Sequence, residues 1–477
     1  MTQPKNETQA SLFTLDELSV RTGESGERLK AWQELGLVGT PGSDSFGPRD
    51  VAHTEMIRDL LRLGVTVEAI ADAASRKDPE FMRLVGWCVY DFDRPLYSIS
   101  HAAEVTGLDL DQLRRLLEAM GIHGRDDALT DDDISALQCG RIALDAGFPE
   151  DGLVQLLRVF SDALGRAAEA THRTTHIYMY DRMKASGISD SDVDARMVAA
   201  DGALSPLLEP TILYFLRRGL ARATRDDALL HLAQAFGIQQ EGEAPGQFDA
   251  AIVFVDLSSF SPLAEAMGDV KAAEVLQRFS SLVRRAADVH HGRVIKQIGD
   301  AFMLVFSDVR SAIACSLEIE SRTEDEPQFP AVKSGIHWGS VLYREGDYVG
   351  TTVNLASRLT DVAARHAVVV TAAVRQAAAG LPGVEFVRLG KRSLKGIAAD
   401  EVLFEARIEG PQGVDRAIDP VCGMELGPGE VAATLALDGE TRVFCSDDCL
   451  RTFVSTPERY QSRHGSPAEG EHEPATL

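Results

Sequence analysis

Long apolar runs are missing from this 477-residue sequence, in which no stretch approaches the roughly 18 apolar residues that cross a bilayer. The first ten residues are polar and lack the apolar core of a signal peptide. Positive charge is also scarce, because 48 Lys and Arg stand against 73 Asp and Glu, a formal net charge of −25. Such a charge repels polyphosphate backbones and anionic lipid, so we expect a cytoplasmic protein that binds neither nucleic acid nor membranes.

Cysteine is rare, with six residues in the whole chain. Three are isolated and are expected to be small buried hydrophobes: Cys88, Cys139 and Cys315. The other three cluster near the C-terminus, and in a reducing compartment such a cluster indicates metal before disulfide: Cys422, Cys445 and Cys449. The remaining composition is that of globular proteins, and the length suits about three domains of roughly 100–200 residues each.

An internal repeat opens the chain. The segment LFTLDELSVRTG (Leu12–Gly23) aligns with LYSISHAAEVTG (Leu96–Gly107), and each unit predicts a helix, a turn, a helix, a loop and a helix. Thr14 and Glu17 have the spacing of a capping box before an apolar helix face. The sequence therefore predicts an all-α, helix-turn-helix-like N-terminal region.

The segment TGESGERLKAWQELGLV resembles the winged helix-turn-helix of MerR-like regulators. However, residues 1–75 hold seven Lys or Arg against twelve Asp or Glu, whereas a reader of DNA needs a basic face. We therefore expect a regulatory or dimerising scaffold rather than a DNA-binding unit. Residues 10–165 are assigned to a tandem MerR-like regulatory domain, and residues 166–246 to a helical regulatory or linker region.

From Phe248 onward the apolar pattern changes to short strands alternating with helices. The strand-like segments include FDAAIVFVDL, GRVIKQIGDAFMLVF, AVKSGIHWGSVLY and AVVVT. This alternation predicts an α+β domain with an antiparallel or mixed sheet covered by helices on one face.

Two carboxylates stand at the ends of these strands. Asp256 follows an apolar strand, and Asp300 lies in a tight turn beside Gly299. Such a pair can share two Mg²⁺ ions for phosphoryl transfer, although each alone is an ordinary turn aspartate. The segments FVDLSSFS, IKQIGDAFMLVF and GDYVGTTVNLASRL, in this order, resemble the class III adenylyl and guanylyl cyclases across residues 247–408.

The resemblance implies a ferredoxin-like α+β fold and formation of 3′,5′-cyclic AMP and pyrophosphate from ATP. Asp256 and Asp300, with the carbonyl of Leu257, would bind two Mg²⁺ or Mn²⁺ ions per active site. Asn354 would orient the ribose, and Arg358, one helical turn later, would stabilise charge on the transferring phosphorus. In this family the metal-binding and purine-reading residues come from opposite subunits, which implies a head-to-tail homodimer.

The same resemblance assigns recognition of the purine to Lys296 and Asp347. Lysine donates and aspartate accepts hydrogen bonds, which complements adenine and favours ATP over GTP. A guanylate cyclase is the alternative on this point. Lys395 is a candidate triphosphate contact, or else a solvated surface lysine.

The N-terminal half further resembles a bacterial subgroup in which a helical domain inhibits the cyclase until the pH falls. Histidine titrates in that range, and four histidines are candidate sensors, although interface carboxylates are an alternative: His101, His172, His176 and His231. A different reading is a transcription regulator that uses the cyclase fold to sense nucleotides.

The C-terminal segments DPVCGM and FCSDDC resemble the YHS (TRASH-like) domain across residues 415–462. Thiolates favour Zn²⁺ or Cu⁺, so the cysteine cluster is a candidate metal site in a small module. Three cysteines leave a fourth position open, for which Met424, Asp419 or a histidine is available; the alternative is a small fold without metal. Residues 463–477 have a disordered composition.

Overall fold

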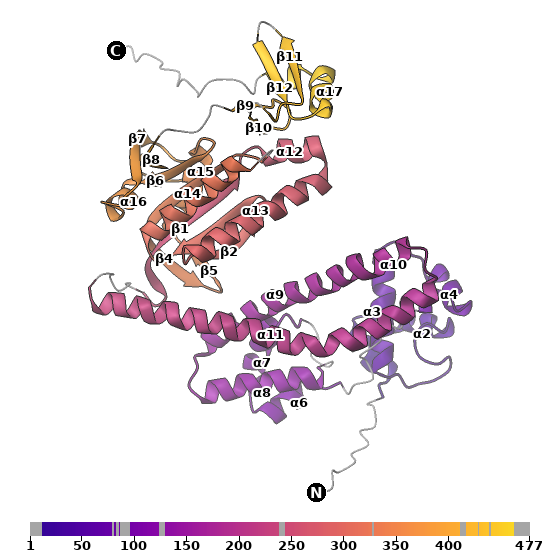
Figure 1. The fold of residues 1–477 in the computed structure, drawn as a ribbon. Coiled ribbons are helices and arrows are strands. Elements are labelled where there is room, and N and C mark those ends of the chain that lie inside the picture. Colours follow the sequence, from indigo (N-terminus) through magenta and orange to yellow (C-terminus); the bar gives the residue numbers. More distant parts are fainter. Residues whose placement is uncertain are drawn as a thin grey trace, which may run out of the picture. The chain divides into compact units, whose positions relative to one another are not determined.

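The computed structural model describes residues 12–78, 81–82, 85, 96–123, 129–237, 244–326, 329–410, 416–427, 429–437 and 440–461. The chain divides into two compact units, Met1–Ala203 and Leu204–Leu477. The described part of the first unit is helical, and the second contains the strands (Figure 1). Among the described helices, none combines the length and apolarity needed to span a membrane. The isolated Cys88 lies outside the described residues.

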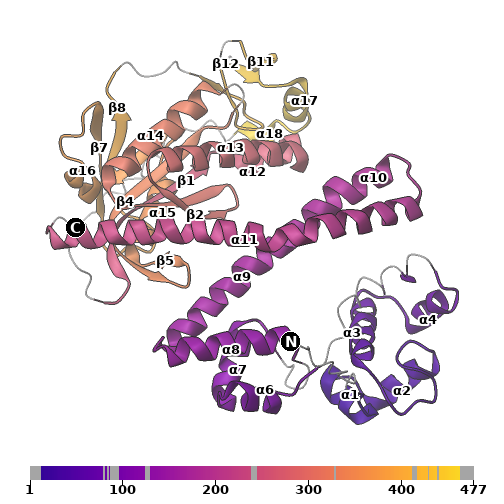
Figure 2. The same ribbon diagram turned by 60° about the horizontal axis from the view of Figure 1, so that its bottom comes forward.

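The internal repeat is confirmed by two sets of helices in the same order (Figure 2). The first set consists of α1 (Leu15–Thr22), α2 (Gly26–Glu34), α3 (Pro48–Arg62) and α4 (Val67–Ser75). The second consists of α6 (Ile99–Thr106), α7 (Leu110–Ala119), α8 (Asp131–Asp145) and α9 (Glu150–Thr175). Each set also has one antiparallel bridge in the corresponding place, Phe13 with Phe46 and Tyr97 with Leu129.

Local sequence explains how the first helix of each repeat begins and ends. The Glu17 backbone N–H donates to the Thr14 hydroxyl, and the Glu17 carboxylate accepts from the Thr14 backbone N–H at 2.7 Å, which completes the expected capping box. Gly23 and Gly107 end α1 and α6 with φ of 66° and 68°. Glycine adopts this left-handed conformation without the steric cost that a Cβ would bring.

The two isolated cysteines that the structure describes differ in burial. Cys315 is buried in the second unit, as expected, but Cys139 on α8 is exposed, so the expectation of a buried hydrophobe was wrong there. Helix α8 turns Ile134, Leu137 and Gly140 toward the core, and its 3.6-residue period leaves Cys139 on the outer side.

The region from residue 150 to residue 235 is helical, as the apolar spacing predicted. Helix α9 continues into one π-helical segment (His176–Asp181) and α10 (Arg182–Ala185), and α11 (Asp190–Ala235) follows. Two prolines lie inside α11, at Pro206 and Pro210.

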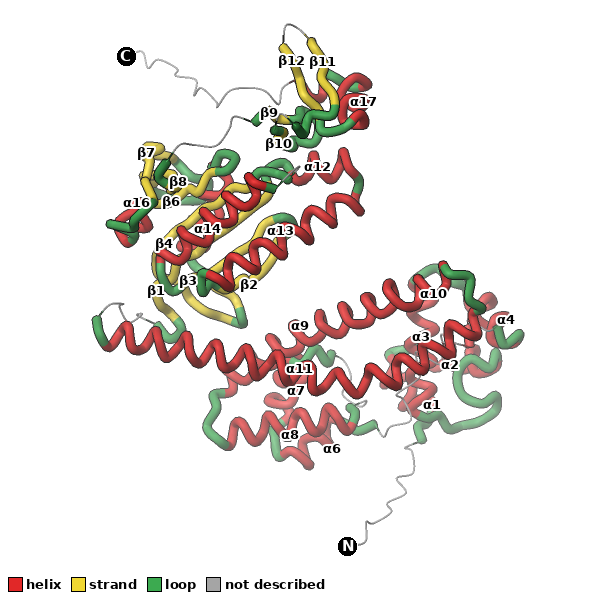
Figure 3. Tube along the Cα trace, in the orientation of Figure 1, coloured by secondary structure: helices red, strands yellow, loops and turns green. Residues whose placement is uncertain are grey.

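The second unit contains one eight-stranded sheet, whose strands are yellow in Figure 3. Its strands run in the order β2-β3-β1-β4-β6-β8-β7, and β5 pairs with β4. Only β4 and β6 pair in parallel among the described strands, so the sheet is mixed. The strands are β1 (Gln247–Leu257), β2 (Arg293–Ile298), β3 (Ala301–Phe306), β4 (Val332–Arg344), β5 (Asp347–Val349), β6 (Ala367–Thr371), β7 (Val384–Arg392) and β8 (Glu401–Ile408).

Four helices of this unit cover one face of the sheet, namely α12 (Phe260–Met267), α13 (Asp269–Val289), α14 (Val309–Asp325) and α16 (Ala372–Ala377). Helix α13 buries residues at three- and four-residue spacing, including Val275, Phe279 and Val283, which gives it one apolar face. Phe279 meets Phe302 of β3 edge-on, with ring centroids 5.3 Å apart.

The expectation of helices on one face only was wrong. Helix α15 (Thr351–Val362) packs on the opposite face, where Ala356 joins the core formed by Ile252 and Phe254. The physical reason lies in β1, whose central residues are buried without alternation, so both of its faces need cover. Helix and sheet approach closely at Gly335, where an added Cβ would lie 2.5 Å from the Ala356 carbonyl oxygen.

The C-terminal segment forms a small module of short strands and helices beside the sheet (Figure 1). It consists of β9 (Ala417–Ile418), β10 (Glu425–Leu426), β11 (Ala433–Leu437), β12 (Glu440–Phe444), α17 (Asp447–Ser455) and α18 (Glu458–Gln461). The buried rings of Phe444, Phe453 and Tyr460 contact one another at tilted angles, with centroids 5.4 Å apart for the first pair and 6.1 Å for the second. These aromatic residues belong to the same continuous apolar core as α13 and α14.

Candidate active site

Two carboxylates meet where β1 ends and β2 turns into β3. Asp256 is next to last in β1, and the β1–β3 register that pairs Val255 with Phe302 places Asp300 beside it. Gly299, with φ of 63°, allows the tight turn that carries Asp300. Burial raises the pKa of Asp300, and the neighbouring Asp256 carboxylate raises it further. Two half-buried carboxylates that repel each other form a donor set suited to divalent cations.

A lysine that the sequence analysis did not single out completes this group. The β1–β4 register pairs Asp256 with Lys333, and the Lys333 Nζ lies 3.1 Å from the Asp256 Oδ2. Both side chains are mostly buried. A charged residue within the apolar strand segment AVKSGIHWG was the available signal, because burial of a lysine in a strand requires a partner.

Removal of the Lys333 charge is expected to tighten divalent-cation binding. A Lys333→Gln variant should reach half-maximal activity at an about tenfold lower Mg²⁺ concentration, because one competing cation leaves the carboxylate pair. Titration of activity with Mg²⁺ at saturating ATP measures this. Lys391→Gln is the matched control, since Lys391 pairs with Asp400 at the exposed surface. An unchanged or higher Mg²⁺ requirement would contradict the assignment.

The two residues expected to read the purine are in direct contact. Lys296 of β2 and Asp347 of β5 form an ion pair and hydrogen bond. The Asp347 Oδ1 also accepts from the Tyr348 backbone N–H at 2.8 Å. Glu345 and Gly346 have φ of 48° and 79°, a turn that reverses the chain tightly and carries Asp347 back onto β4.

The remaining predicted residues lie on exposed positions. Asn354 and Arg358 stand one turn apart on α15, and the Arg358 Nη1 donates to Asp361 at 2.9 Å. Lys395 is exposed in the connection between β7 and β8. Among the described residues, no hydrogen bond or ion pair joins these three to the carboxylate pair or to the Lys296–Asp347 pair.

The C-terminal cysteines gather into a second candidate site. Ligand atoms of Cys422, Cys445, Cys449 and Asp419 all lie within 4.8 Å of one another. The sulfurs of Cys422 and Cys445 are 3.5 Å apart, and those of Cys445 and Cys449 are 3.6 Å apart. Hydrogen bonds from Cys422 and then Cys445 lower the pKa of Cys449. Three neighbouring cysteine sulfurs are a donor set that suits a soft metal ion.

Asp419 organises this cluster, and of the residues that the sequence offered for the fourth position it is the one grouped with the three cysteines. Its carboxylate is fully buried and accepts from the backbone N–H groups of Val421 and Cys445, each at 2.8 Å. The two cysteine-bearing loops are thus tied to one side chain. Burial raises the pKa of Asp419, which a bound cation would offset.

The candidate sensor histidines do not form one cluster. His172 and His176 are neighbours near the end of α9, with ring centroids 6.3 Å apart, and His176 lies 3.4 Å from Asp181. His101 of α6 stacks on Tyr97, with ring centroids 4.8 Å apart. His231 of α11 lies 3.6 Å from Asp227.

A partly exposed histidine that the sequence analysis missed, His366, lies where the C-terminal module meets the sheet domain. The His366 Nε2 lies 2.9 Å from Glu425 of the module, and its Nδ1 lies 3.6 Å from Glu320 of α14. Burial alone would lower the pKa of His366, but Glu425 and the glutamates of α14 raise it above its ordinary 6.5. The pair therefore stabilises the fold fully between the ordinary pKa of glutamate, 4.5, and that of histidine, 6.5. Its contribution is lost as the pH rises through the raised pKa of His366 or falls through the lowered pKa of Glu425.

Four known families match successive parts of the chain. Residues 13–77 match the MerR HTH family of regulatory proteins, and residues 48–223 match the adenylate cyclase regulatory domain. Residues 244–405 match the adenylate and guanylate cyclase catalytic domain, and residues 417–464 match the YHS domain.

Individual relatives match most of the chain. The pH-sensitive adenylate cyclase MT1302 of Mycobacterium tuberculosis is 28% identical over 76% of this chain and 90% of its own length. The uncharacterized protein Rv2212 of the same species is 30% identical over 75% of this chain and 90% of its own length. An adenylate cyclase of Streptomyces coelicolor is 28% identical over 62% of this chain and 75% of its own length.

These matches and the carboxylate pair define a class III nucleotidyl cyclase. Within that class the chain belongs to the adenylate cyclases that carry an N-terminal regulatory domain, and it adds a C-terminal YHS domain.

Proposed function

We propose that the protein converts ATP into 3′,5′-cyclic AMP and pyrophosphate at two equivalent sites, each formed between two copies of the chain. The observation that carries this proposal is the meeting of Asp256 and Asp300 at the end of β1, where burial first and then the Asp256 carboxylate raise the pKa of Asp300. The family of the catalytic domain supports the same reaction.

The residues of the proposed site have distinct tasks. Asp256, Asp300 and the Leu257 carbonyl would hold two Mg²⁺ or Mn²⁺ ions, which when bound lower the pKa of the 3′-hydroxyl and neutralise phosphate oxygens. Asn354 would hold the ribose so that the 3′-oxygen lies in line with the α-phosphorus. Arg358 would leave its exposed pair with Asp361, which is weakly held, and donate to the phosphate as charge develops.

Adenine recognition rests on the Lys296–Asp347 pair. In the free protein each side chain satisfies the other. An adenine base would enter between them, because its ring nitrogen accepts from the lysine and its amino group donates to the aspartate. A guanine base presents the opposite pattern at these positions, so ATP is the proposed substrate. Lys395 is the proposed additional contact to the triphosphate.

Two copies are proposed because the catalytic groups of one chain are separate. The carboxylate pair lies at the end of β1, whereas the purine pair joins β2 to β5 and Asn354 lies on α15. A head-to-tail pairing would bring the carboxylates of one copy to the purine pair of the other, and would do so twice by symmetry.

Regulation by the N-terminal region is proposed to pass through α11, and to respond to pH as the name of the relative MT1302 suggests. Within the second unit, Arg222 of α11 donates to the Gly292 carbonyl at 2.6 Å and lies 3.5 Å from Asp288. Arg293, which starts β2, lies 3.9 Å from Asp226 of α11 and also donates to the Tyr348 hydroxyl. The helix thus contacts the start of the strand that carries Lys296, and Arg293 links that strand to Tyr348, the neighbour of Asp347.

Cyclic AMP formation by the full chain and by residues 244–477 across pH 5.5 to 8 tests this proposal. The fragment keeps the C-terminal module, because its core is continuous with that of the catalytic domain. We expect the fragment to be active throughout, and the full chain to be suppressed near neutral pH and released by acid. If neither turns over ATP or GTP with Mg²⁺ or Mn²⁺, the catalytic assignment is wrong. Equal pH profiles of the full chain and the fragment would contradict regulation by the N-terminal region.

A nucleotide-sensing transcription regulator is the second candidate, favoured by the MerR-like match over residues 13–77. The charge of the helix-turn-helix argues against this function. There the buried Glu24 forms an ion pair with Arg28 at 3.0 Å, so this arginine is already paired within the protein. A gel-shift assay with the DNA upstream of the coding region, at moderate salt, tests it. We expect no shift.

A further inference from the structure

The loop that carries Cys422 touches the loop that follows the metal-binding strand. Arg365, just before β6, donates from Nη1 to the Gly423 carbonyl at 2.9 Å and from Nη2 to the Ser259 hydroxyl at 2.8 Å. An added Cβ on Gly423 would lie 2.6 Å from the Cβ of Ser259, so the two loops are in van der Waals contact. Ser259 comes two residues after Leu257 and has φ of 64°.

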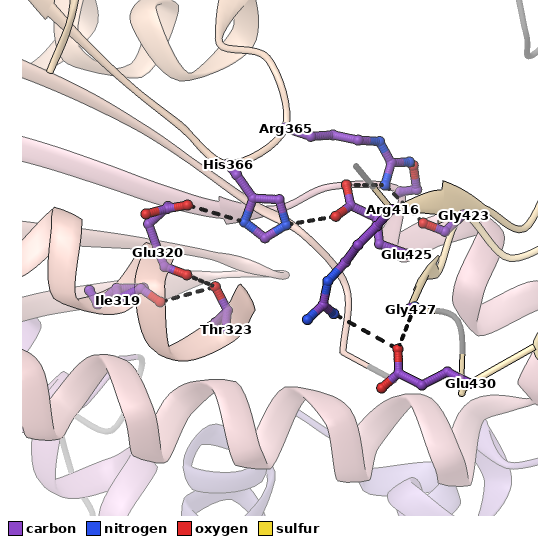
Figure 4. A network of polar contacts seen from close by, with 11 residues as sticks. Ile319, Glu320, Thr323, Arg365, His366, Arg416, Gly423, Glu425, Gly427 and Glu430 are labelled. Atoms are coloured by element: carbon purple, nitrogen blue, oxygen red, sulfur yellow. Dashed lines mark hydrogen bonds and ion pairs between the residues drawn. The ribbon is translucent and has the colours of Figure 1, made fainter. Parts of the chain in front are cut away.

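A network of charged side chains next to this contact also joins the C-terminal module to the catalytic domain (Figure 4). His366 lies between Glu320 of α14 and Glu425 of the module, and Arg365 lies 3.6 Å from the Glu425 Oε1. Arg416 and Glu430 form a further pair within the module at 3.8 Å. Glu425 is only 8% exposed, so these ion pairs of the module with the catalytic domain are shielded from solvent.

We propose that Arg365 is a positioning residue for the metal-binding loop, and that the thiol cluster of the C-terminal module controls the catalytic site through it. The inference rests on the proposed cyclase function and adds a regulatory input at the same site. The ligand of the cluster is a soft metal ion, Zn²⁺ or Cu⁺ by the chemistry of three cysteine sulfurs.

The geometry of the module loop depends on the cluster. The Asp419 backbone N–H donates to the Met424 carbonyl at 2.8 Å, and the Gly423 N–H donates to the Asp419 carbonyl at 2.9 Å. The same Asp419 carboxylate binds the Cys445 N–H, and Cys422 contacts the Cys445 sulfur. A bound metal ion would fix the sulfurs, and therefore the Gly423 carbonyl that follows Cys422 by one residue.

The loop of the catalytic domain needs such support. A serine in the left-handed region is strained, and the Ser259 hydroxyl is held by Arg365. If the Gly423 carbonyl moves away, Arg365 loses one of its partners and Ser259 loses its anchor. The Leu257 carbonyl, two residues earlier, then loses its fixed position at the proposed Mg²⁺ site. Loss of the cluster metal should therefore weaken Mg²⁺ binding.

The test compares Arg365→Gln with Arg459→Gln in the full chain. Arg459 also joins the module to the catalytic domain, through Glu265 of α12, but does not contact the Ser259 loop. Each protein is measured as purified, after removal of soft metals with a thiol-reactive chelator, and after return of Zn²⁺. Two quantities are followed: the Mg²⁺ concentration for half-maximal activity, and amide hydrogen exchange of residues 257–262.

We expect Arg365→Gln to raise the half-saturating Mg²⁺ concentration about ten- to hundredfold, as loss of a supporting contact does at other metal sites, and to speed exchange of the loop. Removal of the soft metal should raise the half-saturating Mg²⁺ concentration and speed loop exchange in the wild type and in Arg459→Gln, and return of Zn²⁺ should reverse both changes. In Arg365→Gln, metal removal should cause no further change in either quantity. A thermal melt that matches the wild type shows that the variant is folded.

The proposal is overturned if metal removal changes neither quantity in the wild type, or if it weakens wild type and Arg365→Gln by the same factor. A full chain that is inactive even at the acidic pH that should release it, and whose loop still loses protection on metal removal, would instead contradict the cyclase assignment and leave the contact standing. The exchange measurement thus separates failure of this inference from failure of the proposed function.

Discussion

An Asp300→Asn variant is expected to form cyclic AMP at least about 10²–10³-fold more slowly than the wild type, whatever the Mg²⁺ concentration. Asparagine keeps the size and shape of the side chain but removes the charge that would hold a divalent cation. Because Asp300 is placed beside Asp256 by the β1–β3 register, a neighbouring residue has no equivalent position from which to replace it.

The same substitution should leave the metal-free protein at least as stable. The pKa of Asp300 is raised, first by burial and then by Asp256, so the folded state disfavours its ionised form. At any pH above that raised pKa, ionised Asp300 costs stability, and asparagine removes this cost. The expected pattern is therefore an equal or higher Tm in chelator together with lost activity.

Cyclic AMP formation with Mg²⁺ and with Mn²⁺, and a thermal melt at pH 7 in chelator, measure the two effects. An Asp308→Asn variant is the control, since Asp308 only caps α14 and lies outside the proposed site. Activity near the wild-type level in Asp300→Asn would show that the carboxylate pair is not the metal site. A lower Tm would show that Asp300 is needed for folding instead.

Mixing two inactive variants is expected to restore about one quarter of wild-type activity. Asp300→Asn damages the carboxylate half of a site, and Asn354→Ala damages the ribose half. In an equal mixture about half of the dimers contain one copy of each, and each such dimer has one intact site of two. The recovery follows from symmetry and needs no new contact.

The control for this mixture is Asp300→Asn with Asp256→Asn. Both substitutions damage the carboxylate half, so no pairing of these copies contains an intact site. Specific activity of each mixture, measured after exchange of subunits, separates the cases. Recovery in the control mixture, or none in the test mixture, would mean that a single copy carries the whole site.

The repeat and the sheet domain could be predicted from local sequence because their signals are local. Thr14 and Glu17 are three residues apart, and their capping box forms within one turn of helix. Gly23 ends α1 by its own conformational freedom. The strands β1 to β4 and β6 likewise follow from apolar periodicity, which each segment carries by itself.

Other features depend on residues far apart in the chain. Lys333 lies 77 positions after Asp256, and only the β1–β4 register brings them together. Cys139 has the same side chain as Cys315, and only the orientation of α8 decides its exposure. The second face of the sheet is covered because α15 packs beside Ile252 and Phe254, residues about 100 positions earlier in the chain.

The sequence by itself determined which chemical groups this protein contains: the paired aspartates, the Lys296 and Asp347 side chains, and the C-terminal cysteines, each within a short motif. Only the tertiary structure decided which groups act on one another. The fold places the Asp419 carboxylate where it accepts a hydrogen bond from the loop of Cys445, and it places Arg365 where it donates to both Gly423 and Ser259. The reason is physical, since motif chemistry is set by neighbours along the chain, whereas contacts between loops are set by how sheet and helices pack around a shared core.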